Sequence, residues 1–214
     1  MAKSAAVAGE RDRAPRRFQR RAPDDRRQAL IEATIESLKQ HGHDGLSVRA
    51  ICAEAGVSIG LINHHFPEKE QLVAESYREL NRRLNEALMS ALAAVQDGAR
   101  ARLHAYFAAT FSRPNLDPEV LSAWVVFWGL QRHSPAVHAV HAEAYSANIR
   151  LLRELLRALE AECGRLRFSL RLAAIGLSAI LDGLWLEYCL DPGTFRPSEA
   201  VAMCESWVDG LMKG

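Results

Sequence analysis

A glycine between two short helical segments is the feature that most constrains how this chain can fold. Within residues 46–66, Ser47 is placed to cap one helix, and Gly56 follows the end of that helix. Glycine tolerates the positive φ at which a chain can leave a helix abruptly. Ser58 is then placed to cap a second helix, because a serine hydroxyl can accept a backbone N–H of the first turn, and Pro67 ends it. The pattern predicts two short helices joined by a tight turn.

The two short helices divide their residues between an apolar side and an almost uncharged side. Helical spacing places the apolar or small residues where the helices touch: Val48, Ile51, Cys52, Ala55, Val57 and Ile62. The second helix turns outward Ser58, Ile59, Gly60, Leu61, Asn63 and His64. Hydroxyl, amide and imidazole groups can bond to base edges and phosphates, so we interpret the pair as a helix-turn-helix that binds DNA. The same spacing also occurs in ordinary helical bundles.

The flanking sequence favours DNA binding. Residues 26–72 contain Ile-Glu-Ala-Thr-Ile, His-Gly-His-Asp-Gly-Leu-Ser-Val-Arg-Ala-Ile and Ala-Gly-Val-Ser-Ile-Gly-Leu-Ile-Asn-His-His-Phe-Pro-Glu-Lys-Glu-Gln-Leu. This segment resembles the amino-terminal domain of TetR-type transcriptional regulators. The resemblance implies DNA contacts at Ser47, Arg49, Ser58, Gly60, Leu61, Asn63, His64 and Lys69. Many relatives have a tyrosine where this chain has Asn63, and that ring contacts a phosphate. We expect the shorter amide side chain of Asn63 to make a hydrogen bond in its place.

Charge is unevenly distributed along the chain. Lys and Arg number 27 and Asp and Glu 26 overall, but residues 1–66 hold 11 basic and 8 acidic groups. Residues 1–22 lack apolar periodicity and are rich in arginine, which predicts a disordered basic arm. Such an arm could lie along phosphates or in a minor groove, or it could be a solvated tail.

Several classes of protein are disfavoured. The four cysteines form no C-x-x-C, and the chain shows no signal peptide and no segment that we interpret as a membrane span, which together favour a cytoplasmic protein with reduced thiols. Histidines cluster in the sequence without the i, i+4 spacing of a ligand pair, so we expect no metal and no cofactor: His41, His43, His64 and His65. No G-x-S-x-G, phosphate loop or Cys–His pairing supports an enzyme.

The remaining chain reads as helices throughout. Apolar periodicity predicts helices over residues 23–42, 68–95, 100–112, 119–133, 134–162, 167–190 and 198–212, with no strand-like alternation. We therefore expect an all-α protein with a basic arm (1–22), a three-helix DNA-binding domain (23–70) and a larger helical effector-binding and dimerisation domain (71–214). The helix that starts at residue 68 begins in one domain and ends in the other, so it is the natural coupling element.

The carboxy-terminal helices carry more apolar residues than one domain needs. Residues 172–186 are almost wholly apolar and are expected to be buried on most sides. We predict that the last two helices form a four-helix bundle with a second copy, which would also supply two recognition helices to a palindromic operator. The alternative is a helix pair inside one chain's core.

The second half of the chain resembles one subfamily of these regulators. Ser-Ala-Trp-Val-Val-Phe-Trp-Gly-Leu-Gln-Arg-His-Ser-Pro-Ala-Val, from Ser122, and Ala-Ile-Leu-Asp-Gly-Leu-Trp-Leu, from Ala179, are similar to the effector domain of choline-responsive BetI-type repressors and their relatives. The resemblance implies a small-molecule ligand but not its identity, because regulators of this type answer to different molecules.

Aromatic residues in this half could form a cation site. Rings at helical spacing, with Asp182 or Glu187 balancing charge, give the candidate effector pocket: Trp124, Phe127, Trp128, Asp182, Trp185 and Tyr188. The alternative is that these rings are core, since aromatic residues at helical spacing usually pack. We interpret His138 and His141 as surface residues. The sequence thus predicts a dimeric repressor released by a choline- or polyamine-like cation, or alternatively by an acyl or other apolar ligand.

Overall fold

The structure, a computed structural model, describes residues 23–113 and 115–212; the predicted arm of residues 1–22 lies outside them. Every regular element in those ranges is a helix, which confirms the all-α prediction. They are α1 (Pro23–His41), the short 3-10 helix η1 (Gly42–Leu46), α2 (Val48–Ala55), α3 (Ile59–His65), α4 (Lys69–Ala93), α5 (Ala99–Thr110), α6 (Pro118–Leu130), α7 (Pro135–Cys163), α8 (Leu170–Leu190) and α9 (Pro197–Met212).

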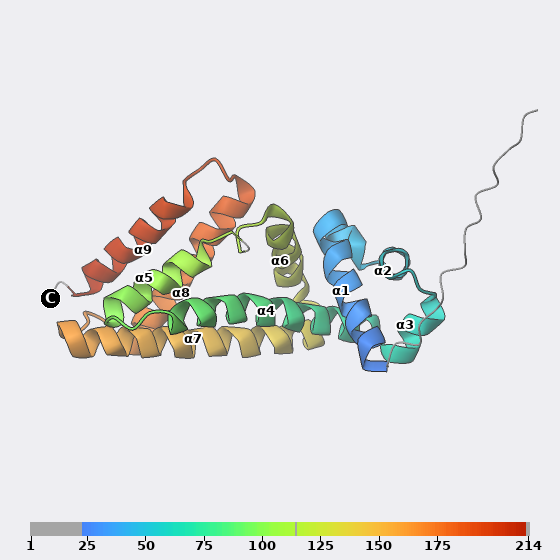
Figure 1. The fold of residues 1–214 in the computed structure, drawn as a ribbon, viewed down its shortest axis with the longest axis horizontal. Helices are drawn as coiled ribbons and strands as arrows, with labels where there is room; N and C mark the ends of the chain where they lie inside the picture. Colours follow the sequence, from blue (N-terminus) through green and yellow to red (C-terminus); the bar gives the residue numbers. More distant parts are fainter. Residues whose placement is uncertain (1–22, 114, 213–214) are drawn as a thin grey trace, which may run out of the picture.

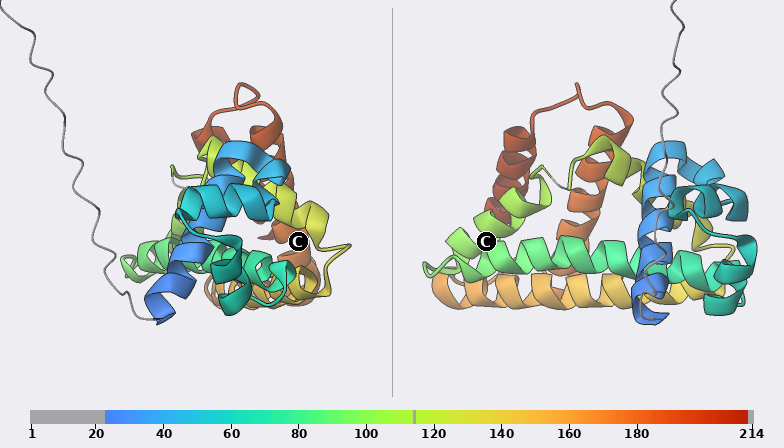
Figure 2. Two further views of the ribbon diagram at one scale, coloured as in Figure 1. Left: turned by 90° about the vertical axis from the view of Figure 1, so that its right-hand side faces the viewer. Right: turned by 45° about the vertical axis from the view of Figure 1, so that its right-hand side comes forward.

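Two long helices form the spine of the molecule. α4 and α7 lie side by side along its long axis (Figures 1 and 2). α1, η1, α2 and α3 gather at one end, α5, α8 and α9 lie toward the other, and α6 lies between the two groups (Figure 1). At 1.5 Å per residue, the 25 residues of α4 span about 38 Å, so this helix reaches from one group to the other.

η1 lies so close to α1 that only glycine fits at position 45. A Cβ added to Gly45 would lie 2.1 Å from the carbonyl oxygen of Ser37. The Ser37 hydroxyl also donates to the Gly45 carbonyl at 2.9 Å, and both residues are buried. This contact fixes the path of the chain into Ser47 and α2.

Three apolar clusters hold the helices together. The amino-terminal core joins α1, α2, α3 and the start of α4: Leu30, Ile31, Ile35, Ile51, Ile62, Phe66 and Leu72. The largest cluster lies among α4–α9. Between them is the joint core, in which α1 and η1 contact α4, α6 and α7: Leu38, Leu46, Val73, Ala74, Tyr77, Leu80, Val120, Ala123, Phe127, Val137 and Val140. The two ends of the molecule are therefore connected by buried apolar contacts as well as by α4.

Ion pairs also connect α1 to α4. Glu32 of α1 pairs with Arg83 of α4, whose Nε lies 2.8 Å from Oε1 of Glu79. A guanidinium nitrogen of Arg82 lies 2.7 Å from the same oxygen. Hydrogen bonds from Arg82 and Arg83 lower the pKa of Glu79 to about 2, so this carboxylate stays charged throughout the physiological range.

The prediction that residues 172–186 are buried on most sides is wrong for a single chain. Leu177 and Leu181 are buried, but Leu172 is 52% exposed, and Leu190 at the end of α8 is 72% exposed. Neighbouring helices cover only one face of α8. By length and composition α8 could also cross a membrane, contrary to our expectation that no segment could, although core helices of soluble proteins meet the same criterion.

Candidate functional site

The turn between α2 and α3 has the geometry that the sequence predicted, with one exception. Ser47 Oγ accepts the N–H of Ala50 at 3.2 Å and caps α2. Gly56 adopts φ +64°, which is the left-handed region that favours glycine. Ser58 occupies the cap position of α3, but its hydroxyl accepts no N–H of that helix, so its predicted cap bond is wrong. The exposed Ser58 hydroxyl is left for other partners.

α3 is anchored on one side and open on the other. Ile62 and the following Phe66 are buried in the amino-terminal core, and the Arg27 guanidinium lies 4.7 Å from the centroid of the Phe66 ring. The outer surface, which we call the reading face, has no lysine, arginine, aspartate or glutamate: Ser58, Ile59, Gly60, Leu61, Asn63 and His64. All of these are exposed except the half-buried Leu61.

Charged and polar residues flank the reading face. Ser47 and Arg49 at the start of α2 and Lys69 at the start of α4 are exposed as well. Ile59, a large apolar residue, is 51% exposed. Each residue that the resemblance assigned to DNA is therefore at least partly accessible.

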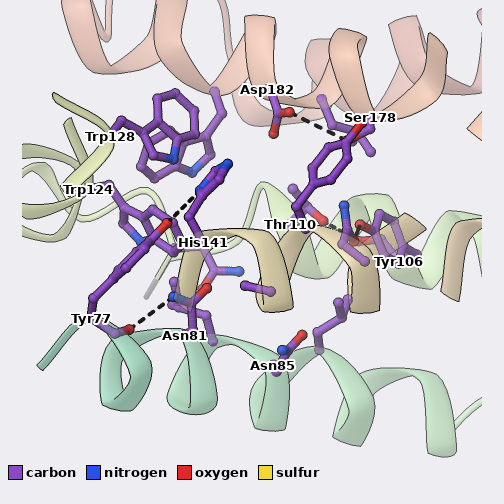
Figure 3. A pocket seen from close by; sticks show the side chains of 18 residues that line it. Tyr77, Asn81, Asn85, Tyr106, Thr110, Trp124, Trp128, His141, Ser178 and Asp182 are labelled. Atoms are coloured by element: carbon purple, nitrogen blue, oxygen red, sulfur yellow. Dashed lines mark hydrogen bonds between the residues drawn. The ribbon is translucent and has the colours of Figure 1, made fainter. Parts of the chain in front are cut away.

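A cavity of about 200 Å³ lies among the helices of the larger domain (Figure 3). Helices α4 to α8 all contribute side chains, and Asn115 contributes from the loop between α5 and α6. One part of the lining is aromatic and the other carries amides, hydroxyls and a carboxylate. None of the described residues that line the cavity is lysine or arginine.

Three indole rings form the aromatic wall of the cavity. The ring centroids of Trp124 and Trp185 lie 5.8 Å apart, those of Trp128 and Trp185 5.7 Å, and those of Trp124 and Trp128 6.3 Å. Tyr77 meets Trp124 edge to face at 5.2 Å. These are the separations of favourable aromatic pairs, and several ring faces together can bind a cation.

Tyr77 and His141 connect the cavity to the joint core. The Tyr77 hydroxyl lies 3.1 Å from Nδ1 of His141. Burial raises the pKa of Tyr77 to about 12 and lowers that of His141, so at neutral pH the phenol donates and the neutral imidazole accepts. The interpretation of His141 as a surface residue is therefore wrong, because α7 turns it toward α4. His138 is exposed, as expected.

Asp182 supplies the negative charge of the cavity. Asp182 is exposed to the open space of the cavity, and the partial burial of its carboxyl among protein atoms raises its pKa to about 6. The Ser178 hydroxyl donates to Oδ2 of Asp182 at 3.4 Å. At neutral pH most molecules carry an ionised Asp182 in a cavity wall that has no lysine or arginine to balance it.

The structure separates the predicted effector-pocket residues into two groups. Trp124, Trp128, Asp182 and Trp185 line the cavity. Phe127 instead stacks on Tyr77 at 4.6 Å within the joint core. Tyr188 packs against Phe195 at 5.7 Å, beyond the cavity. Residues three apart on a helix point about 60° away from each other, so rings that share a broad face need not share a cavity.

Most polar residues of the cavity were not predicted. They are Asn81, Asn85, Tyr106, Thr110, Asn115, His141, Tyr145, Asn148 and Ser178. A signal was present on α4, where Tyr77, Asn81 and Asn85 recur every fourth residue on one line of the helix. In the part of the chain that the structure describes, no three His, Cys, Asp or Glu side chains are arranged to hold a metal ion.

Two family models match the chain. Residues 30–76 match the tetR family of bacterial regulatory proteins, and residues 99–213 match the C-terminal domain of BetI-type transcriptional repressors. The chain belongs to the TetR family, with a BetI-type carboxy-terminal domain. The helix-turn-helix of this family is formed by α2 and α3, inside the matched amino-terminal segment.

Individual relatives of this TetR-family chain cover most of its length. It is 31% identical over 188 residues to the HTH-type transcriptional regulator BetI of Burkholderia thailandensis, covering 87% of this chain and 93% of that protein. It is 32% identical over 194 residues to BetI of Serratia proteamaculans, with 88% and 93% covered. These relatives are regulators, which confirms the prediction that the chain is not an enzyme.

Solved structures share the fold of this TetR-family chain. A transcriptional regulator from Pseudomonas aeruginosa PAO1 is 50% identical with a TM-score of 0.84, covering 92% of this chain and 95% of that one. A transcriptional regulator from Saccharomonospora viridis, solved in complex with choline, is 20% identical with a TM-score of 0.76, covering 87% and 96%.

Proposed function

We propose that this TetR-family regulator is a cytoplasmic homodimeric repressor that binds a palindromic operator and leaves it when a small cation occupies the cavity. The observation that carries the effector half of this proposal is a cavity lined by three indoles and, on its other side, one carboxylate. The cavity also borders Tyr77 of the joint core. The DNA-binding half rests on the family and on the reading face.

The reading face suits the major groove. With α3 in the groove, Ser58, Asn63 and His64 supply hydrogen-bonding groups, while Gly60 lets the backbone approach closely. Arg49 and Lys69 flank the helix and are placed for phosphates, which position a protein on DNA without reading its sequence.

The open face of α8 suits association with a second copy. Exposed apolar residues on α8 and α9 include Leu172, Leu190 and Met203. Large apolar side chains left exposed on both helices favour a protein interface, and two copies of α8 and α9 would bury them in a four-helix bundle. A twofold axis there would present two α3 helices to half-sites about 34–36 Å apart.

A small cation suits the cavity better than an acyl-coenzyme A compound. The described lining of the cavity has no lysine or arginine to bind the phosphates of coenzyme A. The Saccharomonospora viridis protein, which shares this fold, was solved with choline, a cation. Choline is therefore one of the first compounds to test here.

Occupation of the cavity can reach the DNA-binding end through α6. Trp124 lines the cavity, whereas Ala123 and Phe127 of the same helix pack in the joint core against Leu38 and Leu46. A ligand that shifts α6 or Tyr77 would alter the packing of α1 and η1. The difference in operator affinity between the two states is then the coupling free energy.

The test measures operator binding by fluorescence anisotropy, using DNA selected by the protein from a random library. We expect choline, ethanolamine or 1,4-diaminobutane at saturation to weaken binding about tenfold or more. Trp185→Ala should abolish this response and keep DNA binding, whereas Tyr188→Ala, on the same helix outside the cavity, should keep both. Equal loss of response in the two variants would refute the cavity as the effector site. Release only by an acyl compound would replace the cation with the apolar alternative.

A further inference from the structure

Three hydroxyl groups of the cavity donate their protons to neighbouring protein atoms. Thr110 donates to the Tyr106 carbonyl at 2.9 Å, and the Tyr106 hydroxyl donates to Asn148 Oδ1 at 2.6 Å. Ser178 donates to Asp182. In each case the donating oxygen keeps its own lone pairs. These side chains therefore offer acceptors rather than donors to a molecule in the cavity.

Two asparagines are oriented in the same way. The Asn81 amide nitrogen donates to the Tyr77 carbonyl at 3.0 Å, and the Asn115 amide nitrogen donates to the Ala109 carbonyl at 2.8 Å. A flipped amide would place oxygen against carbonyl oxygen, so the carbonyl partners fix both orientations. The amide oxygens of Asn81 and Asn115 are left as acceptors.

Of these acceptors, Asn115 Oδ1 is the one that is buried without a hydrogen-bond donor. Asn115 lines the cavity and is only 9% exposed, and its Oδ1 is buried with no hydrogen-bond partner among residues 23–113 and 115–212. A buried acceptor without a donor is unfavourable, and native proteins rarely leave one. Asn115 belongs to the lining, so a ligand that reaches this oxygen would supply the missing donor.

Most of the acceptors lie apart from the indoles, whereas Asn81 lies beside Tyr77 on the indole side. Figure 3 shows Tyr106, Thr110, Ser178 and Asp182 on the side away from Trp124 and Trp128. Asn115 joins the acceptor end, because it bonds to the carbonyl of Ala109, the residue before Thr110. Donors remain in the lining as well, among them Nδ2 of Asn148, the amide of Asn85 and the Tyr145 hydroxyl. The buried Nε1 of Trp124, at the aromatic end, has no partner within the described ranges.

We propose that the effector is a primary or secondary amine whose N–H groups donate to Asn115, Thr110 and Asp182 while its carbon chain lies against the indoles. This rests on the proposed function, in that it takes the cavity as the effector site. A quaternary ammonium balances the charge of Asp182 but has no N–H, so it leaves Asn115 Oδ1 without a donor. One unmet buried acceptor should lower affinity about tenfold.

The test uses ligands that differ only in their N–H groups. Ethanolamine, N-methylethanolamine, N,N-dimethylethanolamine and choline keep the same chain and hydroxyl, and 1,4-diaminobutane is compared with its hexamethyl bis-quaternary form. Affinity is measured by isothermal titration calorimetry on the full chain, and operator release by anisotropy. We expect affinity to fall as methyl groups replace N–H, by about tenfold or more between the ends of each series.

A matched pair of variants checks the site. Thr110→Val has the same shape and removes the acceptor, whereas Thr110→Ser keeps it. Thr110→Val should weaken binding of the primary amine about tenfold and leave binding of the quaternary compound unchanged, while Thr110→Ser should bind both as the parent protein does. Equal loss for both compounds in Thr110→Val would contradict a hydrogen bond at this position.

The possible outcomes distinguish failure of the amine inference from failure of the proposed function. If choline or the hexamethyl compound binds as tightly as its N–H counterpart and releases the operator, the amine inference fails and the cation-responsive repressor stands. If the amines bind in the predicted order but do not weaken operator binding, the ligand class holds and the effector role fails. If no compound of either series binds a protein that still binds its operator, the amine inference is wrong.

Discussion

The two ends of this molecule form their binding surfaces in opposite ways. The reading face lies on one short helix and its residues are almost consecutive, from Ser58 to His64. The cavity draws side chains from five helices, and Tyr77 and Trp185 on its walls are separated by 108 positions in the chain (185 minus 77). A surface set by local turns should tolerate changes elsewhere in the fold, whereas a cavity set by helix packing should not. The joint core between them is where this contrast can be tested.

Replacing Phe127 by alanine should have the largest effect, because this residue belongs to the joint core that both ends share. Phe127 is fully buried and stacks on Tyr77. Removing a buried phenylalanine side chain costs about 3–5 kcal/mol, which denaturant unfolding would measure. We also expect the effector's influence on operator affinity to fall more than its own affinity does.

The control for this change is Phe111→Ala. Phe111 is also buried, but in the large cluster away from the joint core. It should lower stability by a similar amount and keep the coupling between effector and operator. If both variants lose the coupling equally, general destabilisation rather than the joint core explains the loss.

A pair of glycine substitutions should separate tight packing from backbone strain at the DNA-binding end. Gly45→Ala places a methyl group against the Ser37 carbonyl and should cost about 2–3 kcal/mol, as overpacking does. Gly56→Ala meets nothing within 4 Å, so only the strain of its positive φ, about 1–2 kcal/mol, should appear. Both should weaken operator binding when the protein is warmed, with ligand affinity unchanged at low temperature. A smaller loss of stability for Gly45→Ala than for Gly56→Ala would overturn the close-contact argument.

These contrasts also explain how far the sequence alone could be interpreted. Ser47, Gly56 and Pro67 act on their nearest neighbours, so the helix-turn-helix could be predicted from their order. The indoles could be proposed for a pocket because tryptophans at helical spacing share one face of a helix, and that face lies against either a core or a cavity. Asn115 and His141 could not, because their roles depend on how α5 and α7 pack against other helices.

The single-chain structure explains one wrong expectation in the same way. Apolar composition indicates that Leu172 and its neighbours avoid water, but it does not say which protein surface covers them. Within one chain only one face of α8 is covered, and Leu172 lies on the other. If the proposed second copy covers that face, its burial is a property of the assembly and not of one chain.

The pH dependence of effector binding should identify the charge in the cavity. Since the pKa of Asp182 is about 6, its carboxylate forms as pH rises from 5 to 7, and affinity for a cation should rise over that interval and level off above it. Asp182→Asn should bind the cation about tenfold more weakly at pH 7.5 and lose most of this dependence. Titration calorimetry at pH 5, 6, 7 and 8 measures both.

Two further effects must be kept apart from the charge of Asp182. His141 gains a proton as pH falls, which also disfavours a cation, so the small dependence that survives in Asp182→Asn belongs to this ring. The stability of the ligand-free protein depends on pH in the opposite direction. Because burial raises the pKa of Asp182 above 3.8, this residue's favourable contribution is complete below that pH and is lost as pH rises through 6. An unchanged pH profile in Asp182→Asn would assign the charge elsewhere.

The smallest change that should affect both ends is Tyr77→Phe. It removes only the hydroxyl bonded to His141, keeps the ring stacked on Phe127, and should cost about 1 kcal/mol of stability. Yet this bond ties α7 at the cavity to α4, which enters the DNA-binding domain at Lys69. We therefore expect ligand affinity and operator affinity, measured separately, to stay close to those of the parent protein. The factor by which each ligand weakens the other should decrease.

Thermodynamic linkage provides a second measurement of the factor by which each ligand weakens the other. The factor by which the effector weakens operator binding must equal the factor by which operator DNA weakens effector binding, so two independent titrations must agree. Tyr145→Phe is the matched control, because it removes a hydroxyl from an exposed ring at the rim of the same cavity and leaves the bond between Tyr77 and His141 in place. A factor that falls in Tyr77→Phe and not in Tyr145→Phe would place the coupling in one hydrogen bond between α4 and α7. An unchanged factor in Tyr77→Phe would leave α6 and the apolar contacts of the joint core as the route between the cavity and the DNA.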